Sequence, residues 1–216
     1  MAEKKKINPL LIVLLVLVPI FLIVIALLIG ICIELLVDKV QAEKLANEYK
    51  AVIEEQKEAE KSADKYQLAY NKLVLAMLDD AALAESNGNL VIQVWSNAIW
   101  SKQDDATDKY TMVDGKFVSD FNDALSNLFS DESFSTDMTR LSANQQQIKT
   151  DMKEMVNPPE GYEEAYKALK DLYDSYLSFS NIVLNCNGSL ESFSNDFSEA
   201  DKDILKKYYT AELYIK

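Results

Sequence analysis

Apolar residues form one continuous run near the N-terminus and recur periodically through the rest of the chain. Residues 7–33 contain no charged side chain and are mostly Leu, Ile and Val. About 20 apolar residues cross a bilayer as a helix, so the run predicts a transmembrane anchor over residues 7–37. A cleaved signal peptide is the alternative, but its apolar core is only about 7–15 residues long. We therefore expect an anchor that stays attached.

The charges beside this run predict how the chain crosses the membrane. Three lysines occupy positions 4–6 on its short N-terminal side, whereas Glu34 and Asp38 follow it. Positively charged flanks stay in the cytoplasm. The sequence therefore predicts a single-pass protein of the cell membrane, with a cytoplasmic tail at 1–6 and an extracytoplasmic region at 38–216.

The region after the anchor has the heptad-like spacing of packed helices. Residues 38–157 contain only two glycines, Gly88 and Gly115, and no proline. Alternating steps of three and four residues keep one stripe of a helix facing a partner. We expect the first helix to continue through Gly88 to about Trp100, with a break at residues 86–89 as the alternative. Its two seams are Leu45, Tyr49, Val52, Gln56, Ala59, Ala63, Tyr66, Tyr70, Leu73 and Met77, and then Val74, Met77, Ala81, Ala84, Gly88, Val91, Trp95 and Ala98.

A loop over residues 101–116 and a short helix are predicted before the second long helix. The periodicity is lost in the loop, which contains Asp114 and Gly115. The second long helix is ended by Pro158 and Pro159, because proline cannot continue the hydrogen-bond ladder and restricts the residue before it. The apolar positions are Phe117, Phe121, Ala124 and Leu128 in the short helix, and Phe134, Met138, Leu141, Ile148, Met152 and Met155 in the long one, with the polar Gln145 among them.

Two more helices are predicted after the prolines. The first opens at Pro159, which fits a first-turn position, and stops at residues 185–188. The second begins after Ser189, a suitable N-cap residue. Their apolar stripes are Tyr162, Tyr166, Leu169, Tyr173, Tyr176 and Val183, and then Leu190, Phe193, Phe197, Ile204 and Tyr208.

Together these patterns predict an all-α fold, in which one N-terminal transmembrane helix precedes a long helical stalk and an antiparallel four-helix bundle. Since every α-helix rises about 1.5 Å per residue, the first helix is much longer than the others. Part of it therefore lacks a partner within the chain, and its most charged and least apolar segment is the best candidate. We place the stalk at residues 38–70 and the bundle at 71–216.

The amino-acid composition excludes several classes of function. The chain has no histidine and two cysteines, so His-dependent catalytic triads, His-ligated zinc and four-thiolate metal sites are excluded. Its net charge of −13 argues against nucleic-acid binding, which needs a basic face. No constellation of residues meets the requirements of an active site. We therefore expect no enzyme activity and no cofactor.

A few reactive side chains remain, each with a simple structural interpretation. Asp104, Asp105, Asp108 and Asp114 share one loop, but their spacing is not that of an EF-hand, so a solvated acidic loop is favoured over a calcium site. Asp171 and Asp174 have lysines nearby, which favours ordinary surface ion pairs over acid–base chemistry. Cys186 is expected to be a free thiol, with an intermolecular disulfide as the alternative. Gln145 either fixes helix register or lies at the edge of the core.

One segment resembles a known group of proteins. The sequence NPPEGYEEAYKALKDLYDSY, followed by NGSLESFSNDF, is similar to helical ectodomains of uncharacterised membrane-anchored proteins in Gram-positive bacteria. The use of lysine over arginine, with Arg140 as the single arginine, suits an AT-rich genome. The resemblance covers about residues 90–210, includes no catalytic motif, and implies a fold and a location without an activity.

These observations favour a non-catalytic, membrane-anchored extracytoplasmic domain that binds a protein partner or ligand at the cell surface. A structural coiled-coil spacer or oligomerising stalk, with Tyr49, Val52 and Tyr66 at the contact, is the alternative.

Tyrosine and tryptophan are common at interaction hot spots, although aromatic stripes also fill helical cores. Trp95 and Trp100 lie ~140° apart on a helix, so we expect Trp95 to be buried and Trp100 exposed. The candidate partner-binding residues are Trp100, Tyr162, Tyr166, Tyr173 and Tyr176.

Overall fold

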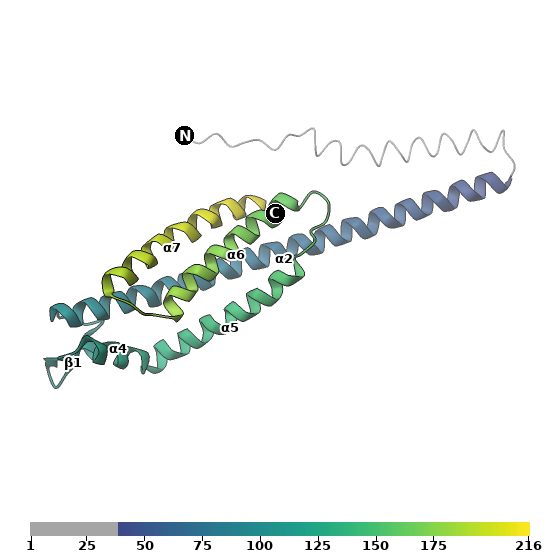
Figure 1. Ribbon diagram of the computed structural model, residues 1–216. Coiled ribbons are helices and arrows are strands. Elements are labelled where there is room, and N and C mark those ends of the chain that lie inside the picture. Colours follow the sequence, from purple (N-terminus) through teal and green to yellow (C-terminus); the bar gives the residue numbers. More distant parts are fainter. Residues whose placement is uncertain (1–38) are drawn as a thin grey trace. The chain divides into compact units, whose positions relative to one another are not determined.

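The computed structural model describes the backbone of residues 39–216 and the side chains of residues 47–216 (Figure 1). The cytoplasmic tail and transmembrane anchor predicted at 1–6 and 7–37 lie outside the described residues. Within residues 39–216, no helix is both long and apolar enough to cross a bilayer.

The described chain is all-α, as the sequence predicts, except for one small hairpin. Four helices are long. A short helix, the hairpin and a second short helix connect the first long helix to the second. In order, the elements are α2 (Lys39–Trp100), α3 (Asp108–Thr111), β1 (Met112–Val113), β2 (Lys116–Phe117), α4 (Phe121–Phe129), α5 (Glu132–Glu154), α6 (Glu163–Leu184), α7 (Leu190–Ala211) and the 3-10 turn η1 (Glu212–Tyr214).

Helix α2 runs through Gly88 without interruption, which confirms the predicted continuous helix and excludes the break at 86–89. The packing around Gly88 explains why a glycine occupies this position. A Cβ atom at this position would lie 2.1 Å from Cε2 of Phe197 on α7. Glycine thus costs helix propensity but allows an aromatic ring to approach the backbone. Phe197 in turn packs on Phe193 and Phe179, with ring centroids 6.2 and 5.2 Å away.

The long helices alternate in direction (Figure 1). The Tyr66 hydroxyl on α2 donates to the carbonyl of Met155, just after α5, at 3.3 Å. The Tyr70 hydroxyl donates to the carbonyl of Ala211 at the end of α7, at 2.8 Å. Near the other end of α2, Trp95 packs against Phe193 at the start of α7. Helices α5 and α7 therefore run antiparallel to α2, in the arrangement of an up-down-up-down bundle.

The core forms two clusters. The larger cluster lies along α2, α5, α6 and α7 and includes Tyr70, Met77, Leu141, Leu172 and Phe179. The second cluster joins the end of α2 to the segment between α2 and α5. It contains Val91, Val94, Trp95, Ala98, Tyr110, Ala124, Leu128, Phe134 and Phe193. The predicted apolar stripes of α2 after Tyr66 and of α5 are thus confirmed as core positions.

The chain divides into two compact units after Glu60. The described side chains of the first unit, from Asn47 to Glu60, are exposed or half-buried. The second unit begins at Lys61 and includes Tyr66 and Tyr70, both buried in the larger core cluster. The predicted boundary between stalk and bundle at residue 71 is therefore too late. Tyr66 is a core residue and is removed from the proposed stalk contact.

Other element boundaries follow local capping chemistry. Ser189 caps α7 as predicted: its hydroxyl accepts from the Ser192 amide in a reciprocal capping box. Asp120 and Asp131 cap α4 and α5, where their carboxylates accept hydrogen bonds from backbone amides of the first turn. The start of α6 was predicted wrongly, because Pro159 lies in a turn and the helix begins at Glu163.

The predicted loop 101–116 contains more structure than its sequence indicates. Met112 pairs with Phe117, and Val113 with Lys116, in an antiparallel hairpin. Asp114 and Gly115 make its turn, with φ of 50° and 75°. Positive φ at both central positions is the geometry that matches the twist of two short strands, and an Asp-Gly pair favours it. Phe117 is therefore in β2 and not in the short helix where the periodicity placed it.

The packing of Gly88 yields a testable prediction. We expect Gly88→Ala to destabilise the protein by about 1–3 kcal/mol, although alanine favours a helix by ~1 kcal/mol, because the new methyl group overlaps the buried Phe197 ring. Chemical unfolding of the full chain in detergent would measure the change. Asn89→Ala, at the exposed neighbour, is the control and should be nearly neutral. A stability gain in Gly88→Ala would contradict the close packing.

Candidate interaction surfaces

The two tryptophans of α2 lie in opposite environments, as expected from their spacing. Trp95 is 4% exposed, and Trp100 is 75% exposed. The Trp95 ring stacks on Phe121 of α4 at 5.7 Å between centroids and contacts Phe193 at 6.2 Å. Trp95 therefore holds the connecting segment against the bundle, whereas Trp100, the last residue of α2, is free to contact another molecule.

The predicted tyrosines do not form one surface with Trp100. The Tyr162 ring packs edge-on against Tyr66, with centroids 5.2 Å apart. Tyr66 and Trp100 are roughly 50 Å apart along α2 at 1.5 Å per residue. Tyr162 and Trp100 thus lie at opposite ends of the bundle. The half-buried Tyr166 and Tyr173 pack against the larger core cluster.

Tyr176 is fully buried, so its inclusion among the partner-binding candidates is wrong. Its hydroxyl donates to Oδ2 of Asp80 on α2 at 2.5 Å. Oδ1 of Asp80 accepts from the side-chain amide of Asn144 on α5 at 2.7 Å. One carboxylate therefore ties together α2, α5 and α6 inside the bundle, and Asp80 is only 2% exposed.

The environment of Asp80 acts on its ionisation in two opposing ways. Burial raises the pKa of the Asp80 carboxyl, and the hydrogen bonds from Tyr176 and Asn144 lower it, with burial the larger effect. Burial, followed by the bond to Asp80, also raises the pKa of the Tyr176 hydroxyl. A buried carboxylate costs stability even when it is hydrogen-bonded, but removing its partners costs more.

The burial of Asp80 has a counterpart in the sequence pattern of α2. Successive steps of four, three, four and three residues lead from Leu73 to Met77, Asp80, Ala84 and Asn87. These five residues therefore lie on one stripe of the helix. Asp80 and Asn87 are both buried. A polar residue at a heptad core position is the pattern that indicates a buried hydrogen-bond network.

Gln145, the other polar residue in a predicted stripe, lies at the edge of the core. Its amide donates to Oγ of Ser180 at 2.9 Å and to Oδ1 of Asn181 at 3.0 Å. It is half-buried and joins α5 to α6. The structure therefore supports the second of the two alternatives for this residue, with an added role in holding two helices together.

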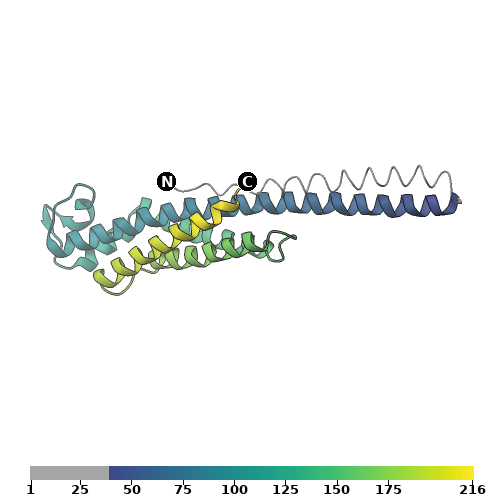
Figure 2. The same ribbon diagram turned by 90° about the horizontal axis from the view of Figure 1, so that it is seen from above.

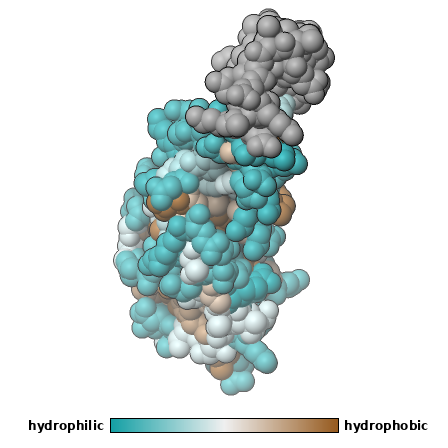
Figure 3. All heavy atoms as spheres, turned by 90° about the vertical axis from the view of Figure 1, so that its right-hand side faces the viewer, coloured by the Kyte–Doolittle hydropathy of each residue, from teal (hydrophilic) through white to brown (hydrophobic). Residues whose placement is uncertain are grey.

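An apolar groove lies between α2 and α7. Leu78 and Ala82 form one wall, and Leu205 and Tyr208 form the other. The groove has a volume of about 160 Å³. Leu78 is 36% exposed and Leu205 is 47% exposed, so the walls are accessible to solvent. The face drawn in Figure 3 is mostly hydrophilic, with hydrophobic side chains in separate patches.

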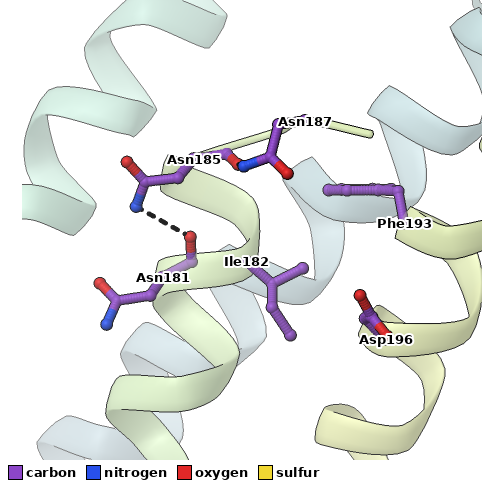
Figure 4. A pocket seen from close by; sticks show the side chains of 6 residues that line it. All are labelled: Asn181, Ile182, Asn185, Asn187, Phe193 and Asp196. Carbon is purple, nitrogen blue, oxygen red and sulfur yellow. Dashed lines mark hydrogen bonds between the residues drawn. The ribbon is translucent and has the colours of Figure 1, made fainter. Parts of the chain in front are cut away.

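A more polar hollow of about 290 Å³ lies where α6 turns into α7 (Figure 4). Three asparagines, Asp196, Ile182 and Phe193 line it. Two of the amides are used by the chain itself: that of Asn185 donates to the carbonyl of Asn181 at 3.0 Å, and that of Asn187 to the carbonyl of Asn185 at 2.7 Å. These side chains therefore cap the end of α6.

The acidic candidates serve local structure. Asp174 pairs with Lys170 at 2.8 Å and Asp171 with Lys207 at 3.7 Å, as expected for surface ion pairs. In the acidic loop, Asp108 accepts from the Asp104 amide at 2.9 Å, and Asp104 accepts from Gln93 at 2.8 Å. Among the described residues, no group of three or more Cys, Asp or Glu side chains is placed to hold a metal ion.

Cys186 is a free, half-buried thiol beside the second core cluster. Burial raises the pKa of this thiol, which keeps it in its less reactive protonated form.

Comparison with family models, with curated proteins and with solved structures gives no match for this chain. The resemblance to Gram-positive ectodomains therefore stays a prediction.

Asp80 yields a prediction about pH. Because burial raises the Asp80 pKa, the ionised carboxylate destabilises the folded state only when the pH exceeds the unfolded value of about 3.8. We expect the stability of Asp80→Asn relative to the unmodified protein to rise as the pH is raised from 4 to 7. Thermal unfolding across this range would measure it, with exposed Asp79→Asn as the control for charge. A pH-independent difference, or one that falls with pH, would contradict the assignment.

Proposed function

We propose that this chain is a membrane-anchored, extracytoplasmic helical domain that binds a protein partner at the cell surface and carries out no chemistry of its own. The uncharged run at 7–33 supports the anchor, and the lysines at 4–6 support a cytoplasmic N-terminus. The single observation that favours partner binding is Trp100, whose large ring is 75% exposed at the end of α2.

The surroundings of Trp100 add to this argument. Ile99 is 41% exposed beside it in sequence. Val113 in the hairpin and Phe129 at the end of α4 are 59% and 39% exposed, and both belong to the segment that continues from α2. Single exposed apolar residues are ordinary, but several within one segment, with an aromatic residue among them, are typical of protein contacts.

The internal polar groups favour binding over catalysis. Asp80 and Tyr176 satisfy each other inside the bundle. Every buried side-chain nitrogen and oxygen in residues 47–216 has a hydrogen-bond partner. Groups that are paired within the fold stabilise it and are not presented to a substrate.

A coiled-coil spacer or oligomerising stalk remains the second candidate. Val52, on the predicted seam of the first unit, is 48% exposed. Because Tyr66 belongs to the core, this contact would use Tyr49 and Val52 alone. A spacer of this kind needs no binding surface at Trp100, which separates the two proposals by experiment.

The first test is topology. Protease added to intact cells should remove residues 38–216 and leave a tag at the N-terminus intact, because the lysines at 4–6 hold that end in the cytoplasm. Immunoblots for N- and C-terminal tags would show this, with permeabilised cells as the control. Protection of the C-terminal tag in intact cells would overturn the proposed location.

The second test separates the two tryptophans. Trp95→Ala should lower the free energy of unfolding by about 3–5 kcal/mol, because it leaves a cavity between Phe121 and Phe193. Trp100→Ala should change it by less than about 0.5 kcal/mol. Trp100→Ala should nevertheless reduce the recovery of cross-linked partners from the host membrane.

The control for this test is Leu68→Ala, which is 72% exposed on α2 but distant from Trp100. It should leave partner recovery unchanged. Equal destabilisation by both tryptophan changes would show that Trp100 is a core residue, and unchanged recovery in Trp100→Ala would favour the spacer.

A further inference from the structure

The groove between α2 and α7 has the features of a docking site. Its floor is made by buried apolar side chains, among them Met77 on α2 and Ile204 on α7. Its walls rise from this floor to Leu78 and Leu205, which are partly exposed. The apolar surface of the groove is therefore continuous with the core, which distinguishes it from scattered surface leucines.

The apolar surface extends beyond the groove on both helices. Leu75 on α2 is 52% exposed, and Tyr209 on α7 is 56% exposed. Helix α2 buries its seam at Val74, Met77 and Ala81, so Leu75 and Leu78 stand outside that seam. Leucines outside the buried stripe of an amphipathic helix serve no purpose in the bundle core. Leu75 and Leu78 therefore add exposed apolar surface to α2 beside the groove.

The charges in the groove decide what kind of element fits. Two acidic side chains, Glu85 and Asp201, line it, and no basic side chain does. The lysines of α7 nearest in sequence, Lys202 and Lys206, are not among the lining residues. A second copy would bring another chain of net charge −13 against this acidic lining. Like charges across an interface are unfavourable, so the lining favours a cationic occupant.

The arrangement of the two helices that border the groove indicates the shape of the element that fits it. Helices α2 and α7 lie side by side and antiparallel, as the contact of Tyr70 with Ala211 and that of Trp95 with Phe193 show (Figure 2). Two such helices leave a straight channel between them, into which the side-chain ridge of a third helix can pack. Peptide helices bind in such channels through apolar residues spaced i, i+3, i+4 and i+7.

We propose that the α2–α7 groove binds the apolar face of a basic amphipathic helix from the protein partner. Leucine-sized side chains of that helix contact Leu78, Ala82, Leu205 and Tyr208. Its Lys or Arg residues pair with Glu85 and Asp201. The inference rests on the proposed partner-binding function. It adds a second binding surface, distant from Trp100, and specifies that the partner's element is apolar on one face and basic on the other.

A designed probe tests this directly. The probe is a fluorescent peptide of about 18 residues, or five helical turns, with leucines on one face and lysines on the other. Binding to the full chain in zwitterionic nanodiscs is followed by fluorescence anisotropy, with empty nanodiscs as the blank. One control peptide has the same composition in scrambled order, and a second replaces lysine by glutamate. We expect only the amphipathic basic peptide to bind.

Matched variants locate the contact. Leu78→Ala combined with Leu205→Ala should weaken peptide binding about tenfold, as expected for the loss of central apolar contacts. Val156→Ala, at a side chain that is 51% exposed just after α5 and outside the groove, should have no effect. Glu85→Gln combined with Asp201→Asn should weaken binding several-fold and reduce its salt dependence. Asp79→Asn, an exposed acid on the same helix that does not line the groove, is the control for the loss of charge.

Each other outcome overturns the inference. Equal binding of the scrambled peptide, or equal effects of Val156→Ala and the groove variants, would show non-specific attraction. Sedimentation that shows self-association lost in the groove variants would assign the groove to a second copy. If partner recovery depends on Trp100 but not on the groove, the groove proposal fails while the proposed function stands. If neither surface matters, both fail.

Discussion

The fold depends on α2 staying a single helix along its buried seam. From Tyr66 to Ala98, this helix supplies core residues to both apolar clusters and contacts elements from every later part of the bundle. A break at Gly88 would separate the two clusters. The Phe197 ring packs against the backbone at Gly88, in the space that a side chain at this position would need. A residue that is unfavourable in an isolated helix is thus fixed by a tertiary contact.

Hydrogen bonds at one end and in the middle of the bundle limit how its helices can slide. The Tyr66 and Tyr70 hydroxyls reach backbone carbonyls after α5 and at the end of α7. Gln67 and Asn71 donate to the carbonyls of Tyr214 and Lys216, at 2.9 Å in each case. In the middle, Asp80 connects three helices. Burial of this carboxylate costs stability, but a register shift would leave it unpaired, which costs more.

This internal use of polar groups shapes what the protein can do. The buried carboxylate of Asp80 and the hydroxyl of Tyr176 are engaged in contacts between helices. The apolar features of the described surface include Trp100 at the end of α2 and the α2–α7 groove. Surfaces of this kind bind proteins through burial of apolar area, with charge at the edge providing selectivity.

Periodicity alone determined much of the architecture. The helical class, the continuity of α2, the stripe of α5 and the opposite exposures of Trp95 and Trp100 follow from spacing on a helix, because the period of 3.6 residues fixes which side chains share a face. Spacing does not say how far along a helix its partners reach. Because Met155 and Ala211 lie beside Tyr66 and Tyr70, the bundle begins nearer the N-terminus than the predicted residue 71.

Tertiary structure also decided which aromatic residues remain accessible. The tyrosines of α6 share a stripe in sequence, yet Tyr176 is buried against Asp80, and Tyr162 packs on Tyr66 at the far end from Trp100. The α2–α7 groove has no counterpart in either helix alone, since its walls come from residues more than a hundred positions apart in the chain. A stripe on one helix is a local property, whereas burial, pairing and a groove between helices depend on what the remainder of the chain brings against it.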